Sequence, residues 1–349
     1  MTSPRVTVLM AFHNGDRHLG AAIDSILLQT FRDFELVLVD DGSTDRSRAI
    51  AASYADPRIR LLPFERNRGL PVALNEGLRA ARGEFVARLD SDDAALPHRL
   101  ETQVAFLDAH PEIAVVGSQA IPIDERGKTL HRVPWFYAQW TRPENGDALA
   151  WYRMFDTPFV HSSVMFRRAA VDGYDERFLR EEDAELWMRI GRRHGLANLP
   201  QPLVAFRLHP HAITRDPARR DGYVERKTRI VHTLLCEGLE QDVPERVARL
   251  WTTANDPGAR LPAADLRELA RALDGCAARF FALHPAARSD GRIARHRASM
   301  SARLAEHAIA ADRVLALSLF AAMVRLHAGA ALRALPRLAA LFILGGRRR

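Results

Sequence analysis

The chain has 349 residues, of which 47% are hydrophobic and 27% are charged, an ordinary composition for a globular protein with a sizeable core. Two cysteines, Cys236 and Cys276, exclude a disulfide framework, lack metal-ligand spacing and indicate a reducing cytosol. The formal net charge of +7 is typical of a protein with a phosphate-rich partner, and basic residues occur along the whole chain rather than in one tail. No run of 18 apolar residues lacks a charge, and the N-terminus lacks signal-peptide features, so no membrane span is expected.

Strands and helices are predicted to alternate over the first 120 residues. Apolar, β-branched segments predict strands within 5–12, 33–45, 58–64, 83–93 and 112–120. Apolar residues at helical spacing predict helices at 16–30, 70–82 and 96–111, with a further helix capped by Ser43 or Thr44. This alternation predicts an α/β fold built on a mostly parallel sheet.

Two groups of carboxylates follow predicted strands. Asp40 and Asp41 end one strand, and the run Asp90-Ser91-Asp92-Asp93 ends another. Ligands of parallel α/β sheets bind beyond the carboxyl ends of the strands, so both groups are expected at the binding edge. Three carboxylates within four positions repel one another, which favours a cation among them.

The sequence contains no glycine-rich phosphate loop, because GxGxxG and P-loop patterns are both missing. A divalent cation held by carboxylates is the other common way to bind phosphate, and Mg²⁺ or Mn²⁺ suits oxygen ligands. The alternative is a purely structural cluster, in which Asp92 or Asp93 caps the helix predicted near Leu96.

The remainder of the chain changes character twice. Residues 125–160 are rich in aromatic residues and turn formers, 161–171 regain strand character, and 180–195 indicate a loop that enters a helix. After about residue 215 the sequence is rich in Ala, Arg and Leu and predicts helices only.

Five blocks of sequence together resemble the family 2 inverting glycosyltransferases of the GT-A fold. They are VTVLMAFHNG, QTFRDFELVLVDDGSTD, NRGLPVALNEGLRAARGEFVARLDSDD, HSSVMFRR and EEDAELWMRI, and they occur in the family's order within residues 4–210. The resemblance implies a Rossmann-like sheet with flanking helices, a nucleotide-sugar donor, a DxD-type motif that holds Mg²⁺ or Mn²⁺, and a one-step displacement with inversion. It divides the chain into a nucleotide-sugar-binding half at 1–124, an acceptor-binding half at 125–215 and a helical region at 216–349.

The resemblance also assigns roles to the carboxylates. By position, Asp41 resembles the residue that contacts the donor base, Asp90 the residue near the ribose, and Asp92 the metal ligand, with Asp93 in support. Asp183 resembles the general base that accepts the acceptor hydroxyl's proton. The alternative for Asp183 is an acidic first helical turn that complements the helix dipole.

Further binding residues follow from the same comparison of positions. His13 stands where many relatives carry an aromatic residue that stacks on the base, and the departure weakens the preference for a UDP-sugar. His209 stands where relatives often carry a histidine that contacts the metal or the diphosphate, with His211 as a weaker candidate. His161 contacts the acceptor or is a structural histidine, and Arg189 binds phosphate or pairs with a glutamate.

The C-terminal segment 313–349 is apolar, is interrupted by arginines and ends in three of them. It fits an interfacial helix on an anionic membrane, which would favour a lipid-linked acceptor, or a packed subdomain or dimer face. Nucleic acid is not an expected partner, because aromatic and basic residues are not interleaved on one face. The oligomeric state is left open.

The sequence thus predicts a metal-dependent inverting glycosyltransferase (EC 2.4) of the cytoplasm, peripheral to the inner face of the plasma membrane. Its donor is a nucleotide-diphosphate sugar, its acceptor is a glycan or a lipid-linked glycan, and its product is a cell-surface polysaccharide. The alternatives are a nucleotidyltransferase that acts on sugar phosphates and a non-catalytic nucleotide-sugar-binding scaffold.

Overall fold

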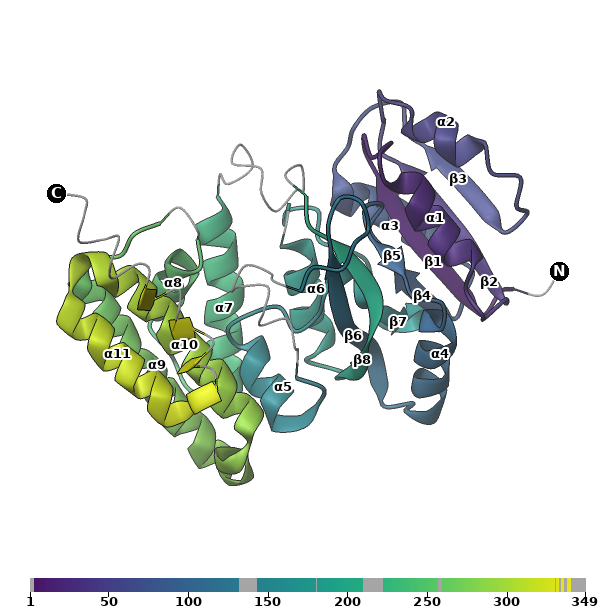
Figure 1. Cartoon of the computed structure of the whole chain (residues 1–349). Helices are drawn as coiled ribbons and strands as arrows, with labels where there is room; N and C mark the ends of the chain where they lie inside the picture. The colour runs from purple at the N-terminus through teal and green to yellow at the C-terminus, as the bar shows by residue number, and fades with distance from the viewer. Residues whose placement is uncertain are drawn as a thin grey trace. The chain divides into compact units, whose positions relative to one another are not determined.

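The computed structural model describes residues 3–131, 143–179, 181–209, 222–256, 259–329, 331–332, 334–335 and 338–339 (Figure 1). The chain divides into two compact units. The first contains residues 1–144 and 157–217, and the second contains 145–156 and 218–349. The division of the chain at residues 124 and 215 by function stays a prediction.

The first unit is built on an eight-stranded sheet in the order β3-β2-β1-β4-β7-β6-β8-β5. Its strands are β1 (Val6–Phe12), β2 (Phe34–Asp40), β3 (Ile59–Pro63), β4 (Phe85–Arg88), β5 (Ala94–Ala95), β6 (Ile113–Ile123), β7 (Met165–Arg167) and β8 (Gly195–Arg207). The pairings give all strands except β5 and β7 the same direction. The predicted α/β fold with a mostly parallel sheet is therefore confirmed.

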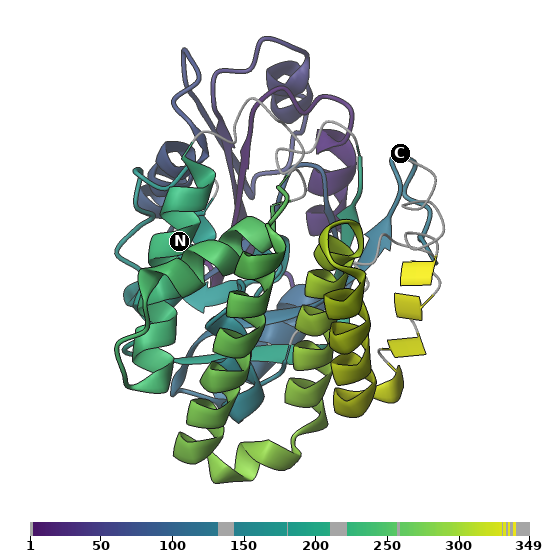
Figure 2. The same cartoon turned by 90° about the vertical axis from the view of Figure 1, so that its left-hand side faces the viewer.

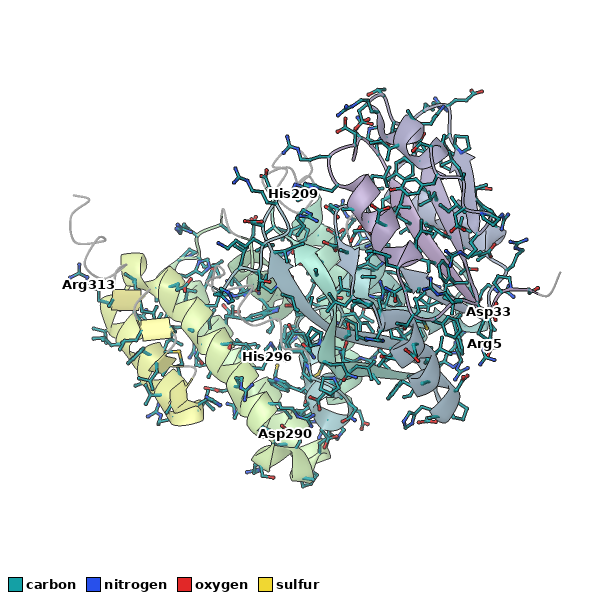
Figure 3. All side chains as sticks on the ribbon, turned by 45° about the vertical axis from the view of Figure 1, so that its right-hand side comes forward. Arg5, Asp33, His209, Asp290, His296 and Arg313 are labelled. Carbon is teal, nitrogen blue, oxygen red and sulfur yellow. The ribbon has the colours of Figure 1, made fainter. Side chains whose placement is uncertain are left out.

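The carboxyl ends of the parallel strands meet along one edge of the sheet. Phe12 of β1 pairs with Asp40 of β2, so these two strands end at the same level. Arg5 and Asp33, which precede β1 and β2, lie at the opposite end of the sheet from His209, which follows β8 (Figure 3). The loops after β1, β2 and β4 and the end of β8 therefore share one edge.

Helices cover both faces of this sheet. The helices of the first unit are α1 (Leu19–Leu27), α2 (Ser47–Ala52), α3 (Leu70–Ala80), α4 (Arg99–Ala109) and α6 (Glu182–Ile190), with 3-10 turns at His161–Ser163 and Arg168–Ala170. Alternate residues of β1 point to opposite faces, as the period of a strand requires. Val8 and Met10 belong to the core shared with α1 and α4, whereas Leu9 belongs to the core shared with α3 and α6.

Two strands and one helix start differ from the sequence-based prediction. The longest strand, β8, was not predicted, because Pro200 and Pro202 interrupt its pattern; register shifts opposite Gln119 accommodate them. The two-residue β5 was also not predicted. Helix α2 begins at Ser47 without a cap from Ser43 or Thr44, since both residues instead bond to the loop after β1.

The described elements of the second unit are all helical, as predicted for the residues after about 215. These elements are α5 (Gly146–Arg153), α7 (Tyr223–Leu239), α8 (Glu245–Ala254), α9 (Ala263–Leu283), a 3-10 turn at Pro285–Ser289, α10 (Gly291–Ala311) and α11 (Arg313–Leu326). Helix α5, in the segment 145–156, was not predicted. Helices α9, α10 and α11 run side by side (Figure 2). Among the helices that the structure describes, none combines the length and the apolar character needed to cross a bilayer.

Two helical glycines allow a test of how closely α3 packs on the sheet. A Cβ atom on Gly77 of α3 would lie 2.1 Å from Leu9 Cδ1, whereas one on Gly275 of α9 would meet nothing within 4 Å. We expect Gly77→Ala to lower the free energy of unfolding by about 1–2 kcal/mol, because overpacking outweighs the gain in helix propensity. Gly275→Ala should raise it by about 0.5–1 kcal/mol.

Urea unfolding of both variants, followed by circular dichroism, measures the difference. A Gly77→Ala variant as stable as the Gly275→Ala variant would contradict the close approach of α3 to β1.

Candidate active site

The loop after β1 is fastened to the loop after β2 at the carboxyl edge. Asn14 has a positive φ of 53°, which asparagine tolerates better than most residues. Its Oδ1 accepts a hydrogen bond from the Thr44 N–H at 2.8 Å, and Ser43 Oγ accepts from the Asn14 N–H at 3.1 Å. Ser47 Oγ accepts from the Gly15 N–H at 2.9 Å. These bonds fix both loops in the positions from which their side chains can face a ligand.

Asp41 is buried at this edge and orders the loop that leads into α3. Its two carboxylate oxygens accept hydrogen bonds from the Arg68 N–H at 2.6 Å and the Gly69 N–H at 2.9 Å. The Asp41 carbonyl oxygen lies 2.8 Å from His13 Nδ1, and the His13 side chain is exposed. The two residues assigned to the donor base therefore lie together.

The Asp90 carboxylate is paired with a buried cation. Arg88, at the end of β4, is almost fully buried and forms an ion pair with the Asp90 carboxylate. Ser162 Oγ lies 2.7 Å from Asp90 Oδ2 and accepts from the Asp90 N–H at 3.2 Å. Burial by itself would raise the pKa of Asp90, but the Arg88 charge outweighs burial and holds the pKa below its ordinary value. Asp90 is thus ionised at neutral pH.

Asp93 is connected to this pair through Ser162 and is shielded from solvent. Its Oδ1 accepts from the Arg207 N–H at 2.7 Å, and its Oδ2 is hydrogen-bonded to Ser162 Oγ. Burial, and then the negative charges of Asp92 and Asp90, raise the pKa of Asp93 well above its ordinary value. Ser162 has one hydroxyl proton and cannot donate to both carboxylates. A proton on Asp93 lets Asp93 donate to Ser162, which then donates to Asp90.

Asp92 faces a pair of histidines. Asp92 Oδ2 lies 2.9 Å from His209 Nε2, and the Arg207 Nε–H donates to the Asp92 carbonyl at 2.7 Å. The His209 ring centroid lies 5.4 Å from that of His18, at the start of α1. Burial, followed by the charge of Arg207, lowers the pKa of His18, so that ring is neutral at pH 7. The two residues predicted to bind metal, Asp92 and His209, are therefore in contact.

The acidic cluster fits a hard divalent cation. One oxygen from each of Asp90, Asp92 and Asp93 lies within 4.8 Å of the others. The side chains of Asp90 and Asp92 keep 31% and 36% of their surface accessible, whereas Asp93 is buried. The first and third residues of the Asp-Ser-Asp run can thus meet a ligand from solvent, as a DxD motif requires. Carboxylate oxygens are the donors that Mg²⁺ and Mn²⁺ prefer.

Asp183 lies at the start of helix α6. Asp183 lies in its first turn with Oδ1 2.7 Å from the Ala184 nitrogen, which donates to it. Tyr174 Oη lies 3.0 Å from His161 Nε2. Burial raises the pKa of Tyr174; the charge of Arg88 opposes this shift, and the charges of Glu182, Asp183 and Asp90 add smaller increases. The charges of Asp183 and Asp90 thus both act on Tyr174.

His161 and Arg189 both have protein partners in this region. Burial, and then the charge of Arg88, lower the pKa of His161 well below its ordinary value, which leaves the ring neutral beside Tyr174. Arg189 donates two hydrogen bonds to the Glu185 carboxylate, at 3.0 Å each, and one to the Gly173 carbonyl at 2.7 Å. The pairing with a glutamate, which the sequence left open for Arg189, is present. His211 lies outside the described residues.

Residues of the site that were not singled out from the sequence include Asn14, His18, Arg88, Ser162 and Arg207. A signal existed for Arg88, since a cation inside an apolar strand needs a buried partner. Ser162 and Asn14 act through loop geometry, which residue types alone do not indicate.

The model of Glycosyl transferase family 2 matches residues 7–174. EpsE of Bacillus subtilis is 39% identical over 54% of this chain and 67% of its own length. The amylovoran biosynthesis glycosyltransferase AmsE of Erwinia amylovora is 37% identical over 58% of this chain and 75% of its own length. The chain belongs to glycosyl transferase family 2. Its activity is accordingly that of a glycosyltransferase, EC 2.4, and the Asp90–Asp93 cluster is consistent with the DxD motif.

Solved structures share the fold of this family 2 chain. TarS 1–349 of S. aureus, in complex with UDP-GlcNAc, aligns with a TM-score of 0.56 and 18% identity over 98% of this chain and 92% of that chain. The mannosyltransferase PcManGT of Pyrobaculum calidifontis, in complex with GDP-Man and Mn²⁺, aligns with a TM-score of 0.52 and 20% identity over 91% and 87% of the two chains. The predicted GT-A fold is confirmed.

The proton assigned to Asp93 predicts a pH-dependent stability. Because its pKa is raised in the folded state, the wild type loses stability as pH rises from the ordinary value of 3.8 through the folded-state pKa. Asp93→Asn keeps an acceptor for the Arg207 N–H and a donor to Ser162 without a titratable group. Its free energy of unfolding relative to wild type should therefore increase by up to about 1.4 kcal/mol per pH unit across this range.

Urea unfolding at a series of pH values measures this slope. Asp93→Ala serves as the contrast, because it also lacks the titratable group but leaves the buried Arg207 N–H without its acceptor; it should be about 1–3 kcal/mol less stable than Asp93→Asn at every pH. Parallel pH profiles for wild type and Asp93→Asn would show that Asp93 carries no proton.

Proposed function

We propose that this glycosyltransferase moves a sugar from a nucleotide-diphosphate donor to a growing glycan, with a divalent metal ion and with inversion at the anomeric carbon. The observation that supports the proposal is the acidic cluster at the carboxyl edge. In this cluster the carboxylates of Asp90 and Asp92 are accessible, whereas that of Asp93 is buried and hydrogen-bonded within the protein. Asp41 and His13, at the end of the neighbouring strands, supply the surface for the donor base.

Asp92 and Asp90 would hold Mg²⁺ or Mn²⁺, with His209 beside Asp92. The ion, when bound, neutralises the charge that develops on the departing nucleoside diphosphate. Arg88 keeps Asp90 ionised, and the Asp93–Ser162 contact keeps the loop in place, so the cluster is pre-organised. Asp90 is also the proposed contact of the ribose.

Asp183 is the proposed general base. Inversion in one step requires the acceptor hydroxyl to attack from the side opposite the leaving group and to lose its proton there. Asp183 lies on a different element from the acidic cluster, at the start of α6, and acts on the same phenol as Asp90. His161 and Arg189, which flank this region, are the proposed acceptor-side residues.

The donor class is supported by the solved relatives, since TarS is bound to UDP-GlcNAc and PcManGT to GDP-Man with Mn²⁺. AmsE, a curated relative, is a glycosyltransferase of amylovoran biosynthesis. We therefore assign this chain to the synthesis of a bacterial surface polysaccharide, with a UDP-sugar as the favoured donor and a glycan or lipid-linked glycan as acceptor.

A thermal-unfolding panel of UDP-, GDP- and dTDP-sugars, each with and without Mn²⁺, tests donor and metal together. A true donor at about 100 times its dissociation constant should stabilise the fold by roughly 2.7 kcal/mol. The shift should require Mn²⁺ in wild type and disappear in Asp92→Asn. Stabilisation by every nucleotide-sugar in the absence of metal, or by none in its presence, would contradict the proposal.

Replacing the proposed base should abolish turnover but leave donor binding. We expect Asp183→Asn to lower kcat by about 10²–10⁴-fold, the usual contribution of a positioned base, with an unchanged Mn²⁺-dependent donor shift. Glu182→Gln is the matched control, because Glu182 is the neighbouring carboxylate in the same helical turn. NMR analysis of the product's anomeric configuration checks inversion.

The remaining outcomes separate the alternatives. Loss of activity in Glu182→Gln but not in Asp183→Asn would move the base to Glu182. Release of pyrophosphate rather than a nucleoside diphosphate would indicate a nucleotidyltransferase. Donor hydrolysis that is equal in wild type and Asp183→Asn would indicate a nucleotide-sugar-binding scaffold.

A further inference from the structure

The net charge of the chain belongs to its last 37 residues. Residues 313–349 contain seven arginines and no acidic residue, which leaves 43 basic and 43 acidic residues in the rest of the chain. Although basic residues occur throughout, residues 1–312 are formally neutral and the whole +7 resides in 313–349. A phosphate-rich partner that is attracted by net positive charge would therefore bind to this segment.

Helix α11, which opens the segment, is apolar on two opposite faces. Ala316, Leu319 and Met323 are buried on the face that packs along α10. The other face exposes Val314, Leu317 and Val324, whose exposed fractions are 78%, 58% and 42%, with the exposed Ala321 between them. Their spacing of three and four residues places these side chains in one stripe along the helix.

The same arrangement recurs after α11 ends. The backbone breaks at His327, and residues 328–329, 331–332, 334–335 and 338–339 are helical again. Ala331, Ala334 and Leu338 are buried, whereas Leu332 and Leu335 are 70% and 45% exposed. Among the large hydrophobic residues that are exposed in the described chain, five of seven lie within residues 314–335: Val314, Leu317, Val324, Leu332 and Leu335. Such a concentration marks an interaction surface.

We propose that the exposed face of α11, defined by Val314, Leu317 and Val324, docks on an anionic phospholipid membrane without crossing it. Arg313 and Arg325 are exposed on α11, and Arg313 extends outward at its start (Figure 3). Arginine side chains beside an apolar stripe bury their stems and direct their guanidinium groups to lipid phosphates.

Charge decides between a membrane and a second copy of the chain. A symmetric dimer through this face would bring Arg313 and Arg325 of both copies together, and residues 313–349 contain no acidic residue to pair with them. An anionic lipid surface complements the same charge and accepts the apolar stripe among its acyl chains. The proposal goes beyond the proposed function and does not depend on which sugar is transferred.

Flotation of the full chain with lipid vesicles tests the docking surface. The protein should float with vesicles that contain phosphatidylglycerol and remain unbound with pure phosphatidylcholine vesicles. The triple variant Val314→Ser/Leu317→Ser/Val324→Ser should bind anionic vesicles about tenfold or more weakly, because three apolar side chains no longer enter the bilayer. Arg313→Glu/Arg325→Glu should weaken binding and lower its salt dependence.

Leu28→Ser is the matched control, because Leu28 is 71% exposed but lies outside the surface, after α1. This variant should bind anionic vesicles like wild type, and circular dichroism should show that all variants remain folded. Equal binding by the triple variant and by wild type, or no flotation of the wild type, would overturn the proposal. So would a wild-type dimer in light scattering that the triple variant converts to a monomer, since the face would then be covered by a second copy.

Discussion

The active site depends on the ion pair between Arg88 and Asp90 at the end of β4. Three carboxylates within four positions repel one another, and burial adds to the cost of ionising them. The buried guanidinium keeps one carboxylate charged, and the Ser162 hydroxyl links it to Asp93, whose pKa is raised. The protein therefore concentrates negative charge at the accessible Asp90 and Asp92 while it keeps the buried position neutral.

The parallel strands place this acidic loop beside other loops at one edge of the sheet. Because β1, β2 and β4 run in one direction, the loops that contain Asn14, Asp41 and Asp90 follow neighbouring strand ends. Hydrogen bonds between loops then fix their conformations, as between Asn14 and Thr44. Helix α6, which follows the antiparallel β7, contains the proposed base Asp183, and the end of β8 places His209 beside Asp92. The site thus combines strand ends of the sheet with the start of a helix.

Much of this arrangement could be predicted from the sequence, and the exceptions have physical reasons. Apolar strands that end in aspartates predict both the parallel sheet and its acidic edge, since the pattern is local. Strand β8 was not predicted, because its prolines interrupt the strand pattern in the sequence. The segment forms a strand by pairing with β6. Ser162 acts on Arg88 and Asp90 through contacts 72 to 74 residues apart in sequence, which no local pattern encodes.

The contact between Asp93 and Arg207 spans 114 residues, and this separation has a consequence for biosynthesis. A nascent chain released from the ribosome only as far as β6 has its first strands and helices, but its acidic loop lacks both the Arg207 amide and the His209 ring. Sequential synthesis therefore leaves the acidic loop without these partners until the end of β8 has emerged.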